Sequence, residues 1–286
     1  MPFIDQAGAR LHYEETGHGY PLVFVHEFGS DAREWEMQVR ALSRHYRCIT
    51  FNARGYPPSG VPADPDLYGW EFARDDIGAV LDGLDIGRAH LVGLSMGAYA
   101  TLAFGLRYPE RASALVVAGC GSGAPAAHQE NFIRDSQNNA RLFLEQGVAA
   151  VADTMGHGPT RIQLKHKDPR GWADFMAHLR EHSATGSGHT MARYQAGRPS
   201  LWAFEAALRQ LHLPVLLAVG DEDEPCLEAN LYLKRQLPNA GLWVAPNTGH
   251  AINLEEPAAF NQAVSDFLAA VGGGTWRQGF AAPARS

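Results

Sequence analysis

The stretch from residue 91 to residue 97 constrains the fold of this chain more than any other feature. An apolar run, His90-Leu91-Val92, leads into Gly93-Leu94-Ser95-Met96-Gly97, and apolar residues then recur at helical spacing from Tyr99. The pattern predicts a buried strand, a tight turn and a helix. Glycines on both sides of Ser95 allow the cramped backbone angles that would lift its hydroxyl above the sheet edge. A serine that merely caps the helix fits these residues equally well, so the rest of the chain has to decide.

Apolar runs of strand length alternate with amphipathic segments through the first 118 residues. Residues 3–4 and 11–13 predict an edge hairpin, and residues 22–26, 48–51 and 114–118 predict further strands. Helical periodicity covers 35–42 and 77–84. This alternation predicts an α/β fold with a doubly wound, mostly parallel sheet and right-handed crossovers.

The alternation stops after residue 122 and resumes with apolar runs at 214–219 and 242–244. Between them we find only helical segments, such as 132–146 and 172–180, with expected breaks at 156–159, 167–169 and 186–188. We therefore expect a helical cap inserted before the sixth or seventh core strand. The predicted division is core at 1–122, cap at 123–212, core again at 213–271, and a flexible tail at 272–286.

Composition excludes several classes of function. The net charge of -7 and the mixed placement of charges show no basic stripe, so we expect no nucleic-acid partner. The cysteines, Cys48, Cys120 and Cys226, are odd in number and show no C-x-x-C spacing, which argues against a disulfide framework or a zinc site. The N-terminus lacks the pattern of a signal peptide, and no apolar run is long enough to span a bilayer. We expect a cytoplasmic protein without a membrane partner, either a monomer or a homodimer.

Chemically active residues follow several of the predicted strands. In an open α/β sheet ligands bind beyond the carboxyl ends of the strands, where this chain has residues 26–29, Ser95, residues 220–223 and residues 247–250. A serine hydroxyl needs an adjacent base to become a nucleophile, and the base needs a carboxylate to orient it. The chain supplies a serine, an aspartate and a histidine in that order, as expected of an α/β-hydrolase sheet.

These motifs together resemble the α/β-hydrolase fold superfamily across nearly the whole chain. Within it, the chain is most similar to cap-bearing esterases, enol-lactonases and carbon–carbon bond hydrolases. The resemblance implies that Ser95 is the nucleophile, that His250 acts first as general base and then as general acid, and that Asp223 orients His250. Because residues 221–224 are all acidic, Asp221 is the alternative to Asp223.

The resemblance also implies an oxyanion hole formed by the backbone N–H groups of Met96 and Phe28. Here the chain departs from its relatives, which usually have His-Gly where it has His26-Glu27. A glutamate does not adopt positive φ without strain, so the hole would be built differently. We expect Glu27 to turn away into a polar or salt-bridged niche; the alternative is that Glu27 contacts a polar or cationic substrate group or positions water.

The sequence predicts a serine hydrolase that cleaves small carboxylic esters through an acyl-enzyme, with no metal or cofactor. A carbon–carbon bond hydrolase, a lactonase or an amidase would use the same three residues. A small-molecule receptor or a cofactor-free oxidoreductase is also compatible with the fold, because function belongs to the site rather than the scaffold. The histidines of the predicted cap show no metal-site spacing, so we expect them on solvated helix faces; they are His157, His166, His178, His182 and His189.

Overall fold

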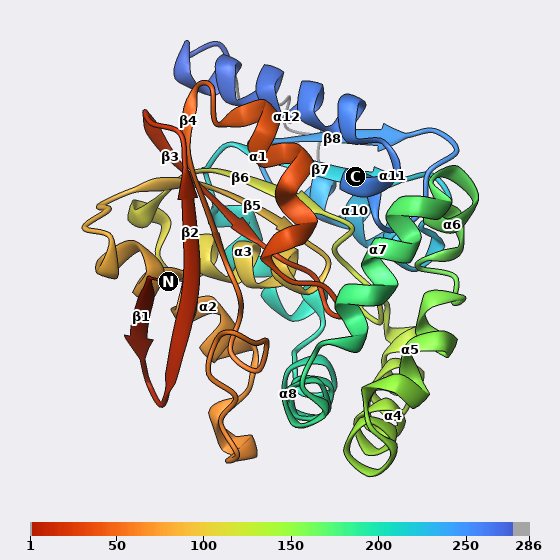
Figure 1. Cartoon of the computed structure of the whole chain (residues 1–286). Coiled ribbons are helices and arrows are strands. Elements are labelled where there is room, and N and C mark those ends of the chain that lie inside the picture. Colours follow the sequence, from red (N-terminus) through yellow and green to blue (C-terminus); the bar gives the residue numbers. More distant parts are fainter. Residues whose placement is uncertain (1, 277–286) are drawn as a thin grey trace.

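An eight-stranded sheet forms the centre of the molecule, as seen in the computed structural model, which describes residues 2–276 (Figure 1). The strand order is β1-β2-β4-β3-β5-β6-β7-β8. β1 and β2 form the predicted antiparallel edge hairpin, β2 pairs antiparallel with β4, and all other pairs are parallel. The strands are β1 (Phe3–Gln6), β2 (Ala9–Thr16), β3 (Tyr20–Val25), β4 (Tyr46–Phe51), β5 (Ala89–Leu94), β6 (Ala112–Ala118), β7 (Val215–Gly220) and β8 (Ala240–Ala245).

Helices cover both faces of this sheet because its inner strands are apolar on both sides. In β3, Leu22 and Phe24 belong to one buried cluster, and Val23 and Val25 to the other. The first cluster includes residues of α1 (Glu36–Leu42) and α12 (Pro257–Gly272), and the second includes residues of α2 (Trp70–Gly83), α3 (Met96–Arg107) and α10 (Glu224–Gln236). The fold is therefore the expected three-layer, doubly wound α/β arrangement. Shorter helical turns are α11 (Ile252–Glu255) and the 3-10 turns Ala32–Trp35, Pro65–Leu67, Pro109–Arg111 and Leu201–Phe204.

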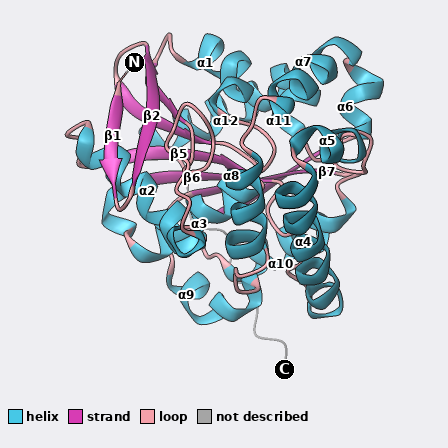
Figure 2. Ribbon diagram, turned by 60° about the horizontal axis from the view of Figure 1, so that its bottom comes forward, coloured by secondary structure: helices cyan, strands magenta, loops and turns pink. Residues whose placement is uncertain are grey.

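All described elements between β6 and β7 are helical, and we call this part the helical insertion. It precedes the seventh of the eight strands, and in Figure 1 its green helices gather at the lower right, beyond one end of the sheet. Figure 2 shows α4, α5 and α8 side by side in front of the strands. The helices are α4 (Ala126–Gln146), α5 (Val148–Gly156), α6 (Ile162–Lys167), α7 (Pro169–Arg180), α8 (Ala184–His189), a π-helical turn (Thr190–Gln195) and α9 (Glu205–Gln210).

One predicted break in the insertion is wrong. Residues 186–188 lie inside α8 instead of interrupting it. The two glycines serve close packing: a Cβ on Gly186 would overlap the backbone of Gly55, and a Cβ on Gly188 would lie 2.6 Å from Leu144 Cγ. Glycine here lets a helix approach its neighbours closely, a tertiary requirement that looks like a chain break in the sequence.

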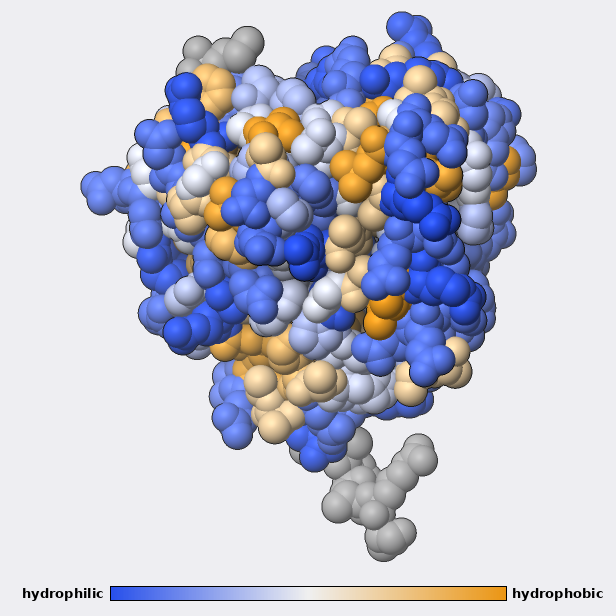
Figure 3. Space-filling model, turned by 90° about the horizontal axis from the view of Figure 1, so that it is seen from below, coloured by the Kyte–Doolittle hydropathy of each residue, from blue (hydrophilic) through white to orange (hydrophobic). Residues whose placement is uncertain are grey.

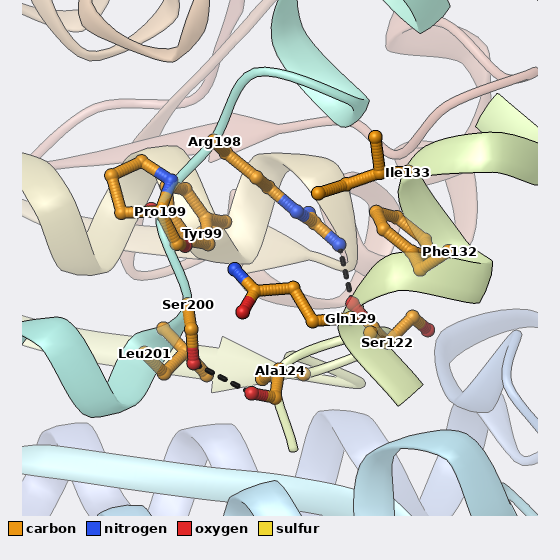
Figure 4. A pocket seen from close by; sticks show the side chains of 12 residues that line it. Tyr99, Ser122, Ala124, Gln129, Phe132, Ile133, Arg198, Pro199, Ser200 and Leu201 are labelled. Atoms are coloured by element: carbon orange, nitrogen blue, oxygen red, sulfur yellow. Dashed lines mark hydrogen bonds between the residues drawn. The ribbon is translucent and has the colours of Figure 1, made fainter. Parts of the chain in front are cut away.

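The two ends of the insertion are joined to each other where the chain leaves and re-enters the core. Figure 4 shows Arg198 Nη2 donating to the carbonyl oxygen of Ser122 at 2.8 Å and Ser200 Oγ donating to that of Ala124 at 2.6 Å. The Arg198 guanidinium also lies between the rings of Tyr99 and Phe132. The cavity left between these side chains is about 10 Å³, room for about one water molecule. The insertion is thus held to the core at its base.

The chain beyond α12 folds back onto the sheet. Trp276 Nε1 donates to the carbonyl oxygen of Asn239 at 3.1 Å, and the Trp276 ring packs edge-on against Phe267. The first part of the predicted flexible tail is therefore packed, and its remainder, 277–286, lies outside the described residues. Among residues 2–276, no helix is long and apolar enough to cross a membrane. The face seen in Figure 3 is mostly hydrophilic, with hydrophobic residues in separate patches.

Candidate active site

Ser95 occupies a strained turn between β5 and α3. Its backbone has φ 52° and ψ -110°, a conformation that non-glycine residues rarely adopt. The flanking glycines allow this turn: a Cβ on Gly97 would overlap the carbonyl oxygens of Val25 and His26, and a Cβ on Gly93 would lie 2.5 Å from Thr101 Oγ1. The side chain of Ser95 is half-buried at the head of α3. The structure thus contains the predicted strand, turn and helix, and the turn has the geometry expected for a nucleophilic serine.

The loops after β7 and β8 bring an aspartate and a histidine together. Gly220 lies so close to Thr248 that a Cβ would overlap its carbonyl oxygen. His250 Nδ1 lies 2.8 Å from Asp223 Oδ2, and both side chains are buried. Asp221, the alternative acid, instead accepts the backbone N–H of Thr248 at 3.1 Å and so holds the histidine loop in place. Of the consecutive acidic residues, Asp223 is the one bonded to the imidazole.

Gly119 lies between the imidazole of His250 and Leu94, the residue before Ser95. Ser95 N donates to Ala118 O at 2.8 Å, which ties the turn to the end of β6. A Cβ on the next residue, Gly119, would be 3.4 Å from both His250 Nδ1 and His250 Cε1, and 3.4 Å from Leu94 Cδ1. Gly119 therefore lies between the imidazole and the strand that leads to the serine, and its positive φ of 55° favours glycine at this position.

Neighbouring charges raise the pKa of His250. Burial by itself lowers the pKa of an imidazole, because it disfavours the charged form. The charge of Asp223 and its hydrogen bond act in the opposite direction, as does the charge of Glu27, and together they outweigh burial and the opposing charge of Arg161. The imidazole is thus a stronger base than an ordinary buried histidine.

The two predicted oxyanion donors lie in segments that touch each other. Gly97 packs against Val25 and His26, so the head of α3 with Met96 abuts the loop that carries Phe28. His26 stiffens this loop: its Nε2 accepts the N–H of Ala53 at 3.0 Å, and its Nδ1 donates to Glu27 O at 2.8 Å. Burial lowers the pKa of His26 to about 4, so the ring stays neutral. That the two N–H groups form an oxyanion hole stays a prediction.

Glu27 is salt-bridged, as expected, but it does not turn away from the site. Its side chain is buried, and Oε2 lies 2.6 Å from Arg161 Nη2 and 3.7 Å from His250 Nε2. Arg161 comes from the insertion, immediately before α6, and its guanidinium lies 4.8 Å from the centre of the Phe175 ring. Glu27 does not have a positive φ, so it carries none of the backbone strain that we associated with this position. The ion pair therefore lies next to the imidazole nitrogen that would accept the serine proton.

A second buried carboxyl group, Glu34, supports the loop from the other side. Glu34 Oε1 accepts the backbone N–H of Glu27 at 3.0 Å. Burial raises the pKa of Glu34 well above its usual range, and the charge of Glu27 raises it further. The raised pKa favours the neutral form of Glu34, and it is the carboxylate of Glu27 that pairs with Arg161 at 2.6 Å.

Among the described residues, one group of side chains has the spacing of a metal site: the ligand atoms of Asp223, Cys226 and His250 lie within 4.8 Å of one another. The 2.8 Å between Asp223 and His250 is the length of a direct hydrogen bond. Cys226 Sγ donates to Gly119 O at 3.2 Å, and burial raises the pKa of its thiol well above the usual range. This arrangement favours a hydrogen-bonded network, since a metal would require the thiolate.

The expectation for the histidines of the insertion is wrong for His182. This side chain is buried, with Nε2 3.1 Å from Asp31 Oδ2, and its ring lies edge-on to Tyr56. Asp31 also binds Arg33, whose guanidinium reaches Glu181 at the end of α7. His182 thus fastens the insertion to the core instead of facing solvent.

A cavity of about 1000 Å³ lies between the core and α7. Ser95 and His250 do not line it. Two of its lining residues contact the ion pair: Glu34 accepts the N–H of Glu27, and Phe175 stacks against Arg161. The Glu27–Arg161 pair does not line the cavity but lies behind these two residues of its wall.

Three residues of the site are not predicted from the sequence. Cys226 follows Asp223 by one helical turn, a spacing that could have suggested a neighbour of the acid. Arg161 and Glu34 carry no local signal, because Arg161 joins Glu27 across 134 positions of sequence and Glu34 belongs to an ordinary acidic helix start.

The chain belongs to the alpha/beta hydrolase family, whose model matches residues 22–263. The fold and the serine turn thus agree with the family that the motifs suggested.

Relatives with assigned names match nearly the whole chain. It is 26% identical over 257 residues to a putative 2-succinyl-6-hydroxy-2,4-cyclohexadiene-1-carboxylate synthase of Bacillus subtilis, covering 87% of this chain and 90% of the relative. It is 30% identical to a 2-hydroxy-6-oxononadienedioate/2-hydroxy-6-oxononatrienedioate hydrolase of Paraburkholderia phymatum, covering 91% of each. Among solved structures, a thermophilic esterase from Thermogutta terrifontis matches with a TM-score of 0.82 and 25% identity over 92% of this chain and 94% of that chain. These matches support an enzyme of the hydrolase class.

Proposed function

We propose that this chain is a serine hydrolase that cleaves small carboxylic esters through an acyl-enzyme intermediate. The observation that carries the proposal is the 2.8 Å contact between His250 Nδ1 and Asp223 Oδ2, with Gly119 between the imidazole and Leu94, the residue before Ser95. Because Nδ1–H donates to the carboxylate, Nε2 is the nitrogen left to accept a proton. The esterase from Thermogutta terrifontis is a whole-chain neighbour with this type of activity.

The reaction then proceeds in two halves. His250 Nε2 takes the proton of Ser95 as Oγ attacks the acyl carbon, and the imidazolium returns the proton to the leaving alcohol. Water, deprotonated by the same nitrogen, attacks the acyl-enzyme and releases the acid. The N–H groups of Met96 and Phe28 stabilise the oxyanion in both halves.

The buried, free cysteines fit the reducing environment of the cytoplasm, where we place the protein; they are Cys48, Cys120 and Cys226.

The test is Ser95→Ala, assayed with 4-nitrophenyl esters of graded acyl length. Loss of the nucleophile is expected to lower kcat by about 10³-fold or more, with the fold retained. A serine-directed phosphonate should label Ser95 in the wild type, as located by mass spectrometry, and abolish turnover. Near-normal turnover in Ser95→Ala, or a label on another residue, would end the proposal.

A carbon–carbon bond hydrolase is the second candidate. The Paraburkholderia phymatum hydrolase and a 2-hydroxymuconate semialdehyde hydrolase of a Pseudomonas strain both match about nine-tenths of the chain. The name of the Paraburkholderia phymatum relative describes a dicarboxylate substrate. A 2-hydroxy-6-oxo-dienoate in the ester panel separates the two activities. Turnover of the dienoate at a kcat/KM above that of every ester would favour the second candidate.

A further inference from the structure

The Glu27–Arg161 ion pair is the feature of the site that the proposed reaction does not use. Its carboxylate lies 3.7 Å from His250 Nε2, and Arg161 Nη2 also donates to the carbonyl oxygen of Phe28 at 3.4 Å. The pair therefore touches the base and the loop of the predicted oxyanion hole. In the proposed reaction the acyl group binds beside this nitrogen, so the ion pair would lie close to it.

Both side chains are almost completely buried: 1% of the Glu27 side chain and 4% of that of Arg161 are exposed. Within the described part of the chain, Glu27 Oε1 and Arg161 Nε have no hydrogen-bond partner. Burying two charges is costly unless each neutralises the other, so the 2.6 Å contact between them holds both in place. Arg161 is thus already satisfied by a carboxylate of its own chain.

We infer that Glu27 is a built-in counterion that occupies Arg161 and makes this site selective for esters with uncharged acyl groups. A substrate carboxylate placed beside Arg161 would have to displace Glu27 or lie next to it, and the second arrangement brings two negative charges together. This inference rests on the proposed ester hydrolysis, and it names Glu27 and Arg161 as specificity-determining residues.

The neighbouring cavity supports the same selectivity. Leaving out Glu34, whose raised pKa favours the neutral form, aspartates and glutamates outnumber arginines six to three among its lining residues, and the whole chain has a net charge of -7. An anionic substrate therefore meets a negative potential next to the site, whereas a neutral ester does not.

The experiment compares two esters with the same length of acyl chain, 4-nitrophenyl butyrate and mono-4-nitrophenyl succinate, which differ by a terminal carboxylate. The wild type should prefer the butyrate. Glu27→Gln frees Arg161 and should raise the succinate-to-butyrate ratio of kcat/KM by about tenfold or more, the expected scale for a hydrogen bond to a charged group. Because the readout is a ratio, damage that affects both esters equally cancels.

Two further variants fix the cause. Glu27→Gln combined with Arg161→Gln should return the ratio toward that of the wild type, because the guanidinium is gone. Glu181→Gln removes one exposed carboxylate of the same cavity without touching Arg161, and it should change the ratio far less than Glu27→Gln does, because solvent screens an exposed charge. Glu27→Gly, which removes the carboxylate together with the side chain, should shift the ratio in the same direction as Glu27→Gln and serves if that variant does not fold.

An unchanged ratio in Glu27→Gln and Glu27→Gly overturns the inference, and so does a gain that persists in the double variant. Binding of succinate, measured by calorimetry, keeps this test separate from the proposed function. Glu27→Gln should bind succinate about tenfold more tightly than either the wild type or the double variant. If the wild type hydrolyses neither ester, the ester proposal fails, and the succinate titration still decides whether Glu27 occupies Arg161.

Discussion

Two buried carboxylates flank His250, and they are held in different ways. Asp223 lies three residues after the end of β7 and bonds Nδ1 at 2.8 Å, with its loop fixed by neighbouring core segments. Glu27 lies two residues after the end of β3, 3.7 Å from Nε2, and its charge is neutralised by Arg161 from the insertion. The first arrangement is complete within the core, whereas the second forms only when the insertion is docked. In the proposed reaction Asp223 orients the base, and Glu27 determines which group can lie beside it.

The largest expected effect concerns Asp223. Asp223→Asn leaves the shape of the loop but removes the charge that fixes the tautomer of His250, so kcat should fall by about 10³- to 10⁴-fold. The measurement is steady-state hydrolysis of the best ester of the panel. Asp221→Asn is the matched control, because it changes an exposed acid of the same loop, and it should stay within about tenfold of the wild type.

Glu27 cannot replace Asp223, because it approaches the other ring nitrogen. A variant Asp223→Asn that kept turnover within tenfold of the wild type would break the distinction between the two carboxylates. It would mean that another carboxylate orients the ring.

The same difference between the two carboxylates separates the features of the fold and site that could be predicted from the sequence from those that could not. The buried strands, the turn at Ser95 and the order of serine, aspartate and histidine follow from residues close in sequence to buried strands, where periodicity and turn glycines are strong signals. The structure contains the predicted strand, turn and helix around Ser95 and brings Asp223 and His250 into contact. These features could be predicted because the information is local or follows from the topology of a parallel sheet.

Other features depend on contacts that no local pattern encodes. The partner of Glu27 is Arg161, and that of His182 is Asp31, and in both cases the insertion meets the core. Gly186 looks like a helix break because a close approach to Gly55 leaves no periodic signal. The sequence can predict that a buried charge needs a partner, as it did for the salt-bridged niche of Glu27. It cannot identify that partner.

A smaller effect is expected on stability when the ion pair is broken from the insertion side. Arg161→Gln leaves Glu27 buried without its counterion, so the free energy of unfolding should fall by about 3 to 5 kcal/mol. Urea denaturation followed by circular dichroism measures this change. The double variant Glu27→Gln, Arg161→Gln should lose less, since no unpaired charge is left buried.

If Arg161→Gln destabilised the protein no more than the double variant, Glu27 would not need a counterion. Glu27, like Asp223, would then be held by core residues alone, and the contrast between the two carboxylates would fail.

The smallest expected effect is a shift in the pH dependence of the reaction. The general base must be neutral, so kcat/KM falls as the pH drops through the pKa of His250, which lies above its ordinary value. Glu27→Gln removes one of the charges that raise this pKa and should move the acid limb of the profile to lower pH. Arg161 is a charge that lowers it, so Arg161→Gln should move the limb to higher pH.

The pH profile of kcat/KM for a neutral ester measures both shifts, with Asp221→Asn as a control in which the limb stays in place. The carboxyl groups nearest the ring are Asp223, Glu27 and, behind Glu27, Glu34, whose pKa is raised by burial and by Glu27. In Glu27→Gln the acid Glu34 loses the neighbour that helps to keep it protonated, so part of the lost charge can reappear there. Glu34→Gln, added to Glu27→Gln, should therefore shift the acid limb further toward lower pH. If the limb of Glu27→Gln moved to higher pH instead, Glu27 would not act on His250 through its charge.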